Sequence, residues 1–128
     1  MKKQIKKAGL ENCVKLTGGK PHDVIPIWIN ACDVFTLPSL NERNPNVMFE
    51  ALGCGKPFVG TKVGGAPEII TSEDYGLLCE PANPKELAEK ILIALDKEWD
   101  DEKIRKYAEQ FRIENKAKEV LEVYKQVI

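Results

Sequence analysis

The sequence contains only one histidine, His22, and its four cysteines are scattered without a C-x-x-C pair. These residue types supply most zinc ligands, and the spacing typical of a zinc site is absent. Cys13, Cys32, Cys54 and Cys79 each lie in or beside an apolar segment, so we expect four buried thiols rather than a disulfide. A catalytic cysteine needs a base nearby, and a single histidine in an expected turn disfavours that role.

The sequence also lacks an excess of charge of either sign and any long apolar run. The formal net charge is -1, so no nucleic-acid or anionic-membrane partner is indicated. The lysine-rich start is interpreted as the solvated face of a helix, with Ile5 and Leu10 turned inward. No apolar run approaches the roughly 20 residues that cross a bilayer, and no signal peptide is recognised. We therefore expect a cytoplasmic protein without a transmembrane segment.

What the chain does contain is an alternation of short apolar segments and helical patterns. Its 128 residues suffice for one domain with a core. Strands that are almost wholly apolar are typical of a parallel sheet covered on both faces, which predicts an α/β fold. The expected strands are Val14–Leu16, Asp33–Leu37, Pro57–Gly60 and Gly76–Cys79.

The expected helices are set by capping residues and by apolar spacing. The clearest start is the capping-box pattern of Asn83, Pro84 and Glu86. Before it, helices are expected at residues 2–9, from a cap at Asp23 to Ala31, and from Asn44 or Asn46 to Gly53 or Gly55, with a short helical turn at 67–70. After it, helices are expected around 104–111 and at 114–128. The last helix is expected to pack on another lobe or chain.

One strand end gathers groups suited to a ligand. Ligands of open parallel sheets bind beyond the carboxyl ends of the strands. The strand ending at Leu37 leads to Glu42, and a helix then begins near Asn46. A helix start offers unpaired N–H groups to a phosphate, and Glu50, one turn further on, can accept hydrogen bonds from ribose hydroxyls. The residues alone leave open that Glu42 is a plain loop carboxylate and Glu50 a plain solvent-facing one.

A second turn, Gly64-Gly65, follows the next strand. Glycines let the backbone approach a ligand closely. They equally suit a tight strand-to-helix turn that binds nothing, and the residues alone do not decide between the two.

The order of these features resembles the donor-binding lobe of the group 1 (family four) glycosyltransferases, which are GT-B enzymes with two Rossmann-like lobes. The resemblance rests on four segments in register: Asp33 to Ser39, the E-x7-E stretch from Glu42 through Glu50 to Pro57, Gly64 to Ile70, and Gly76 to Cys79. It is strongest over residues 33–80 and implies part of the C-terminal lobe of such an enzyme.

The resemblance also implies roles for particular residues. The family transfers sugar from a nucleotide-diphosphate sugar with retention, usually without a bound metal or other cofactor. Glu50 matches the ribose-binding glutamate, and Glu42 matches the glutamate beside the donor sugar, which makes it the catalytic candidate. The amides of Asn46 and Val47 match the helix start that holds the diphosphate. Gly64 and Gly65 match the turn that borders the donor pocket.

The sequence departs from the family pattern in three respects. Arg43 stands where the family often has glycine, and its guanidinium either assists the phosphate or faces water. The phosphate-binding Arg and Lys of the family lie upstream of this segment, and the acceptor-binding lobe is missing. We therefore expect weak nucleotide binding, no transfer by the isolated chain, and self-association through an open sheet edge or the last helix.

Several other functions remain as alternatives. The main one is a non-catalytic module that binds a nucleotide or a partner. A two-carboxylate hydrolase and a GT-B epimerase are weaker, since the resemblance assigns the glutamates to binding and His22 offers little for catalysis. A dinucleotide oxidoreductase is poorly supported, because no G-x-G-x-x-G follows a strand.

Overall fold

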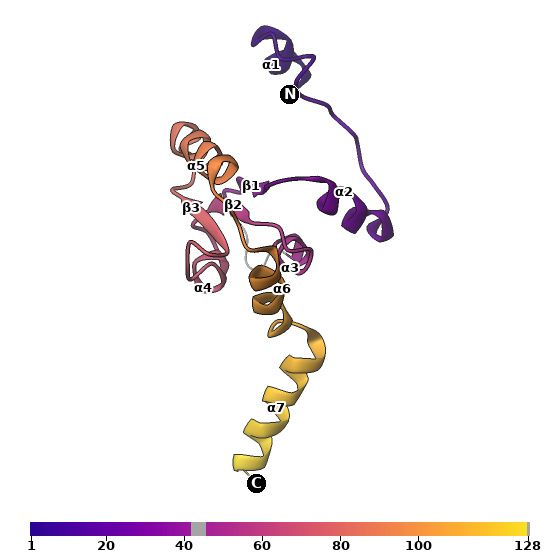
Figure 1. Ribbon diagram of the computed structural model, residues 1–128, viewed down its shortest axis with the longest axis vertical. Helices are drawn as coiled ribbons and strands as arrows, with labels where there is room; N and C mark the ends of the chain where they lie inside the picture. The colour runs from indigo at the N-terminus through magenta and orange to yellow at the C-terminus, as the bar shows by residue number, and fades with distance from the viewer. Residues whose placement is uncertain (42–45, 128) are drawn as a thin grey trace.

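The computed structural model describes residues 1–41 and 46–127 and has an α/β architecture (Figure 1). Three strands form one parallel sheet in the order β1-β2-β3. The elements are α1 (Lys2–Lys7), the 3-10 turn η1 (His22–Val24), α2 (Ile25–Ala31), β1 (Phe35–Leu37), α3 (Asn46–Gly53), β2 (Phe58–Thr61), α4 (Ala66–Ile69), β3 (Gly76–Cys79), α5 (Pro84–Asp96), α6 (Asp101–Glu109) and α7 (Ile113–Val127).

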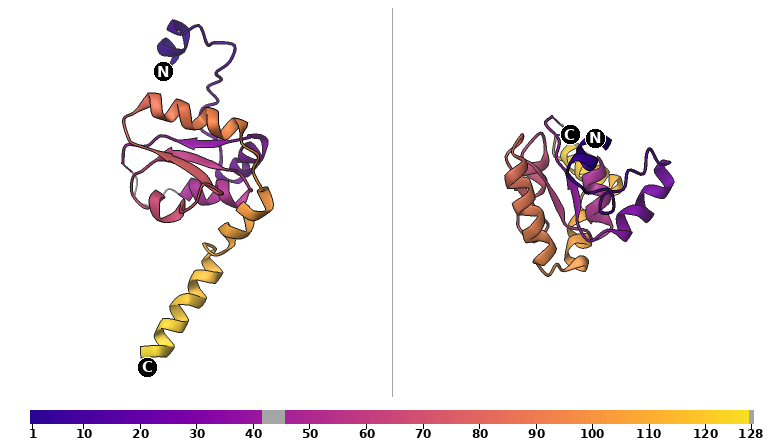
Figure 2. Two further views of the ribbon diagram at one scale, coloured as in Figure 1. Left: turned by 60° about the vertical axis from the view of Figure 1, so that its left-hand side comes forward. Right: turned by 90° about the horizontal axis from the view of Figure 1, so that it is seen from above.

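The sheet is covered on both faces, as the apolar strands predicted. Successive side chains of a strand point to opposite faces, and the central strand β2 shows the result. Phe58 packs in a cluster with Met48, Leu52 and Ile104 from α3 and α6. Its neighbour Val59 packs with residues of β3 and α5. Figure 2 shows α5 on one side of the sheet and α3, α4 and α6 on the other.

The expected helix start at Asn83 is confirmed. The Asn83 side chain accepts a hydrogen bond from the Glu86 backbone N–H at 3.1 Å, and Pro84 begins α5. The Glu86 carboxylate does not return to the Asn83 backbone. It accepts instead from the Asn83 side-chain amide and from the backbone N–H of Glu80, which ties the loop after β3 to the helix.

The expected strand Val14–Leu16 is wrong. This segment lies outside the sheet, with Val14 and Leu16 40% and 45% exposed. A three-residue strand depends on a neighbouring strand for its hydrogen bonds. Here the Cys13 and Val14 N–H groups both donate locally to the Leu10 carbonyl. Residues 1–20 consequently lie apart from the sheet (Figure 1).

Three smaller expectations at the N-terminal end are also wrong. Leu10 is exposed and Ile5 only half-buried, because α1 does not pack on the sheet. Asp23 does not cap a helix, since the chain enters α2 through η1, which follows Pro21 without a side-chain cap. Cys13 is exposed because its segment is outside the core.

The other thiols are free and lie deeper. Cys79 is fully buried in β3, while Cys32 and Cys54 are half-buried, so the expectation of four buried thiols holds fully for Cys79 alone. Burial raises the pKa of all three thiols. A raised pKa keeps a thiol protonated and unreactive near neutral pH.

Candidate functional site

The carboxyl edge of the sheet brings together three chain segments that are distant in sequence. Leu37 of β1 is level with Gly60 of β2 and Leu78 of β3, and Thr61 is level with Cys79. The segments that leave these strands therefore start at one edge. This is the position at which open parallel sheets bind ligands.

Thr61 fixes the shape of this edge. Its hydroxyl donates to the carbonyl of Ser39 across 22 residues of sequence. Thr61 is buried, with 4% of its surface exposed. The turn after β1 is thereby joined to the end of β2. The sequence analysis missed this residue, because a threonine at the end of an apolar strand gives no signal that its hydroxyl reaches another strand's turn.

A small hollow of about 120 Å³ lies at the same edge. Ligand pockets usually enclose about 300–1,000 Å³, so this hollow is smaller than a typical ligand pocket. It is lined by Pro38, Leu40, Thr61, Cys79, Glu80, Ala82, Asn83, Pro84 and Leu87.

Helix α3 begins at Asn46, one of the two expected starts. It is the next element of the chain after β1. Asn46 is exposed and Val47 half-buried. Met48, Ala51 and Leu52 are buried and hold the helix on the sheet. The first-turn N–H groups of a helix have no intrahelical acceptor and carry partial positive charge, so they can receive a phosphate.

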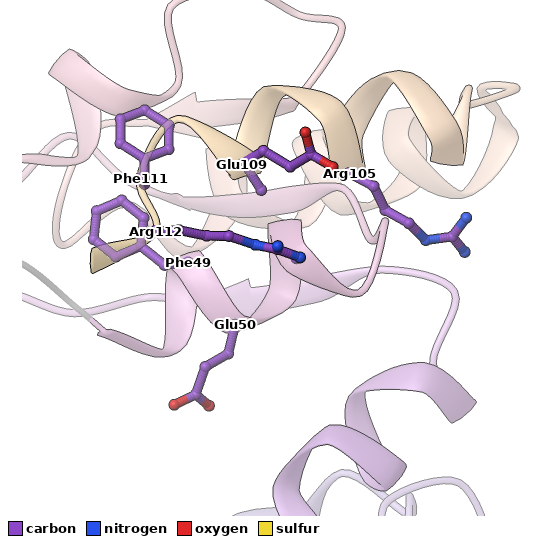
Figure 3. A pocket seen from close by; sticks show the side chains of 8 residues that line it. Phe49, Glu50, Arg105, Glu109, Phe111 and Arg112 are labelled. Atoms are coloured by element: carbon purple, nitrogen blue, oxygen red, sulfur yellow. The ribbon is translucent and has the colours of Figure 1, made fainter. Parts of the chain in front are cut away.

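Glu50 lies on α3 with 28% of its side chain exposed. Figure 3 shows its carboxylate extending from α3 away from Phe49, Phe111 and Arg112. Its Oε1 atom lies 3.9 Å from Nδ1 of His22, on η1. The two groups come from elements 28 residues apart, and sequence reasoning had placed His22 in a turn without a role.

A larger pocket of about 320 Å³ lies between α3 and α6 (Figure 3). It includes Gly53, the last residue of α3, so it extends toward the end of that helix opposite to Asn46. Glu50, which is also a residue of the expected donor site, is among the residues that line this pocket. Its lining is Phe49, Glu50, Gly53, Arg105, Ala108, Glu109, Phe111 and Arg112.

The glycine turn lies where it was expected, between β2 and α4. Gly64 has φ +55, a left-handed conformation that favours glycine. Gly65 precedes α4, and its carbonyl accepts from the N–H groups of Glu68 and Ile69. The backbone conformation therefore explains the glycine at position 64, whereas Gly65, with φ -83, has a conformation open to any residue. A role of either glycine in ligand binding stays a prediction.

Lys62, just before that turn, is paired. Its ammonium donates to Glu80 at 3.1 Å, and this hydrogen bond raises the pKa of Lys62. The pair joins the segments that follow β2 and β3. It adds a cation to the carboxyl edge, but one already neutralised by a carboxylate.

Glu42 and Arg43 lie outside the described residues, so their assigned roles and the spacing of Glu42 from Glu50 stay predictions. Across residues 1–41 and 46–127, no group of three or more His, Cys, Asp or Glu side chains is arranged to hold a metal ion. In the same residues, no helix combines the length and apolar character needed to span a membrane.

The sequence profile of the family described as "Glycosyl transferases group 1" matches residues 1–111. The chain belongs to this family. An uncharacterized glycosyltransferase of Methanocaldococcus jannaschii is 36% identical over 85 residues, which cover 66% of this chain and 24% of that protein. An N,N'-diacetylbacillosaminyl-diphospho-undecaprenol alpha-1,3-N-acetylgalactosaminyltransferase of Campylobacter jejuni is 38% identical over 87 residues, covering 68% of this chain and 22% of the relative.

Solved structures agree with this assignment. Sucrose-phosphate synthase from Thermosynechococcus elongatus has a TM-score of 0.85 at 27% identity, covering 98% of this chain and 33% of that one. HepE of Anabaena in complex with UDP has a TM-score of 0.81 at 31% identity, and the match covers 98% of this chain and 35% of that one. The expected α/β fold, with its likeness to GT-B glycosyltransferases, is thereby confirmed. This group 1 chain spans about a quarter of the length of those curated relatives and a third of those structures.

Proposed function

We propose that this chain forms part of the donor-binding lobe of a glycosyltransferase that uses a nucleotide-diphosphate sugar. The observation that carries the proposal is the meeting of the α3 start, the Ser39 turn and the Gly64-Gly65 turn at one sheet edge. The likeness to HepE, which has been solved with UDP and with UDP-glucose, supports the same class of ligand.

In this proposal the diphosphate lies at the start of α3. The N–H groups of Asn46 and Val47 donate to it, and the partial positive charge of the helix end stabilises its negative charge. The same donors favour departure of the diphosphate, because negative charge grows there as the bond to the sugar breaks. Retention of configuration and independence of a metal are carried over from the family.

Glu50 binds the ribose in this proposal. The Glu50 carboxylate is 28% exposed, and its oxygens have lone pairs enough to accept from two sugar hydroxyls. Glu42 is proposed to act beside the donor sugar and Arg43 near the phosphates, both by family resemblance. Gly64 and Gly65 are proposed, also by family resemblance, to border the donor pocket.

Calorimetric titration of the chain with UDP, GDP and ADP tests the donor site. We expect weak binding of at least one nucleotide. Glu50→Gln keeps the shape of the side chain but removes its charge. Hydrogen bonds to charged groups contribute about 1.5–3 kcal/mol, so the affinity should fall about tenfold or more. Glu89→Gln, an exposed position on α5, is the matched control and should bind as the unaltered chain does. Nucleotide binding that Glu50→Gln leaves unchanged would refute the role given to Glu50.

Transfer requires an acceptor-binding lobe, which we propose comes from another lobe or another chain. The 128 residues alone are expected to transfer no sugar. Mixing the chain with a separate acceptor lobe and a radiolabelled nucleotide sugar distinguishes the two main functions. Labelled product supports the enzyme, whereas nucleotide binding without product supports a non-catalytic binding module.

A further inference from the structure

The pairing of His22 with Glu50 has no place in the roles assigned above. The two side chains approach to 3.9 Å, between Nδ1 and Oε1, and belong to η1 and α3. We propose that His22 is a positioning residue for the Glu50 carboxylate, holding it in the orientation that accepts the ribose hydroxyls. This inference rests on the proposed donor site.

The backbone of η1 is connected to α3 through α2. Helix α2 follows η1 without a break and packs on α3, with Ile29 only 4% exposed. At the end of α2, the Cys32 thiol donates a hydrogen bond to the Ile29 carbonyl. His22 is therefore presented to Glu50 by packed helices, although its own side chain is 88% exposed.

The chemistry of the two groups suits this role. A neutral imidazole carries one N–H donor, and the tautomer with the proton on Nδ1 points that donor at Glu50. The present separation exceeds a hydrogen bond by about 1 Å, a gap that rotation of an exposed side chain can close. The imidazole would occupy one oxygen of Glu50 and leave the other for the ribose.

The contact should act by limiting the rotation of Glu50 before the ligand arrives. Ordering a flexible side chain on binding weakens affinity about two- to tenfold. A Glu50 that His22 already orders avoids that loss. Removing His22 should then weaken only those ligands whose hydroxyls contact Glu50.

The experiment compares a nucleoside diphosphate with its 2′,3′-dideoxy form, which has no ribose hydroxyl for Glu50 to bind. The nucleotide is whichever of UDP, GDP and ADP binds the unaltered chain most tightly. His22→Ala should weaken the ribose form about two- to tenfold and leave the dideoxy form unchanged. In a Glu50→Gln background, His22→Ala should have no further effect.

Two more variants separate positioning from a general structural role. His22→Asn places an amide N–H at the position of Nδ1 and should restore binding. Asp23→Asn changes an exposed charge on the same short helix and should behave as the unaltered chain. Circular dichroism of each variant reports whether the fold is retained.

Distinct outcomes overturn the inference and the donor site. If Glu50→Gln weakens binding and His22→Ala does not, His22 has no positioning role and the donor site stands. Equal weakening of the ribose and dideoxy forms by His22→Ala likewise overturns the inference alone. If none of the three nucleotides binds, the inference falls together with the proposed function.

Discussion

Gly76 offers a sharp test of the packing that supports the site. Gly76 begins β3 and lies level with Phe58 of β2. A Cβ atom at position 76 would lie 2.1 Å from the Phe58 carbonyl oxygen and 3.2 Å from its nitrogen. These are backbone atoms of the central strand, so they cannot move aside as a side chain can.

The magnitude follows from how far the strands would have to separate. Real Cβ contacts are not shorter than 3.0 Å, so the backbones must move apart by about 0.9 Å. The hydrogen bond from Phe58 N to Tyr75 O, now 3.1 Å, would lengthen beyond a normal bond. Overpacking destabilises a folded protein by about 1–3 kcal/mol, and the loss of a hydrogen bond destabilises it by about 1 kcal/mol. We expect Gly76→Ala to lower the free energy of unfolding by about 2–4 kcal/mol.

Gly53→Ala is the matched control, because it makes the same chemical change where a Cβ meets no atom within 4 Å. Gly53 ends α3, and alanine restricts the unfolded chain more than glycine does. This variant should therefore be as stable as the unaltered chain or more stable by up to about 1 kcal/mol.

Urea denaturation followed by far-ultraviolet circular dichroism measures both changes. The midpoint should fall for Gly76→Ala and hold or rise for Gly53→Ala, with similar slopes. Equal midpoints for the two variants would show that the close approach of β2 and β3 at position 76 does not exist.

Three further predictions concern the edge, the surface and the last helix. Thr61→Val keeps the side-chain volume but removes the hydroxyl that donates to the Ser39 carbonyl. The free energy of unfolding, measured by urea denaturation, should fall by about 1 kcal/mol. An unchanged midpoint would contradict that contact. Lys103 bonds Asp74 at 2.8 Å and lowers the pKa of Asp74. The stabilisation by this pair is therefore fully present above about pH 4, the ordinary pKa of Asp, and is lost as the pH falls through the lowered pKa. The gap in thermal midpoint between the unaltered chain and Asp74→Asn should be constant from about pH 5 to 8 and shrink as the pH falls below about 4. A gap that stays constant at every pH would exclude the pair. Helix α7 extends from the body with Tyr124 61% exposed (Figure 2), so we expect self-association that Tyr124→Glu weakens; a monomer at micromolar concentration in size-exclusion chromatography with light scattering would count against it.

Local signals in the sequence were enough for most of the fold. Three of the four expected strands, the α5 start at Asn83 and the glycine turn at Gly64-Gly65 lie where the pattern placed them. Capping residues, glycine turns and apolar runs act over a few residues, so a single chain carries their information. The order of these features was also enough to recognise the family.

The tertiary structure alone decided which distant groups meet. Val14–Leu16 has the composition of a strand, but within residues 1–41 and 46–127 it pairs with no other strand. A β-strand forms its backbone hydrogen bonds only with a neighbouring strand. The bond from Thr61 to Ser39 and the approach of His22 to Glu50 join residues 22 and 28 positions apart. No local pattern encodes such contacts, because they arise only when β2 is laid beside β1 and α2 is packed against α3.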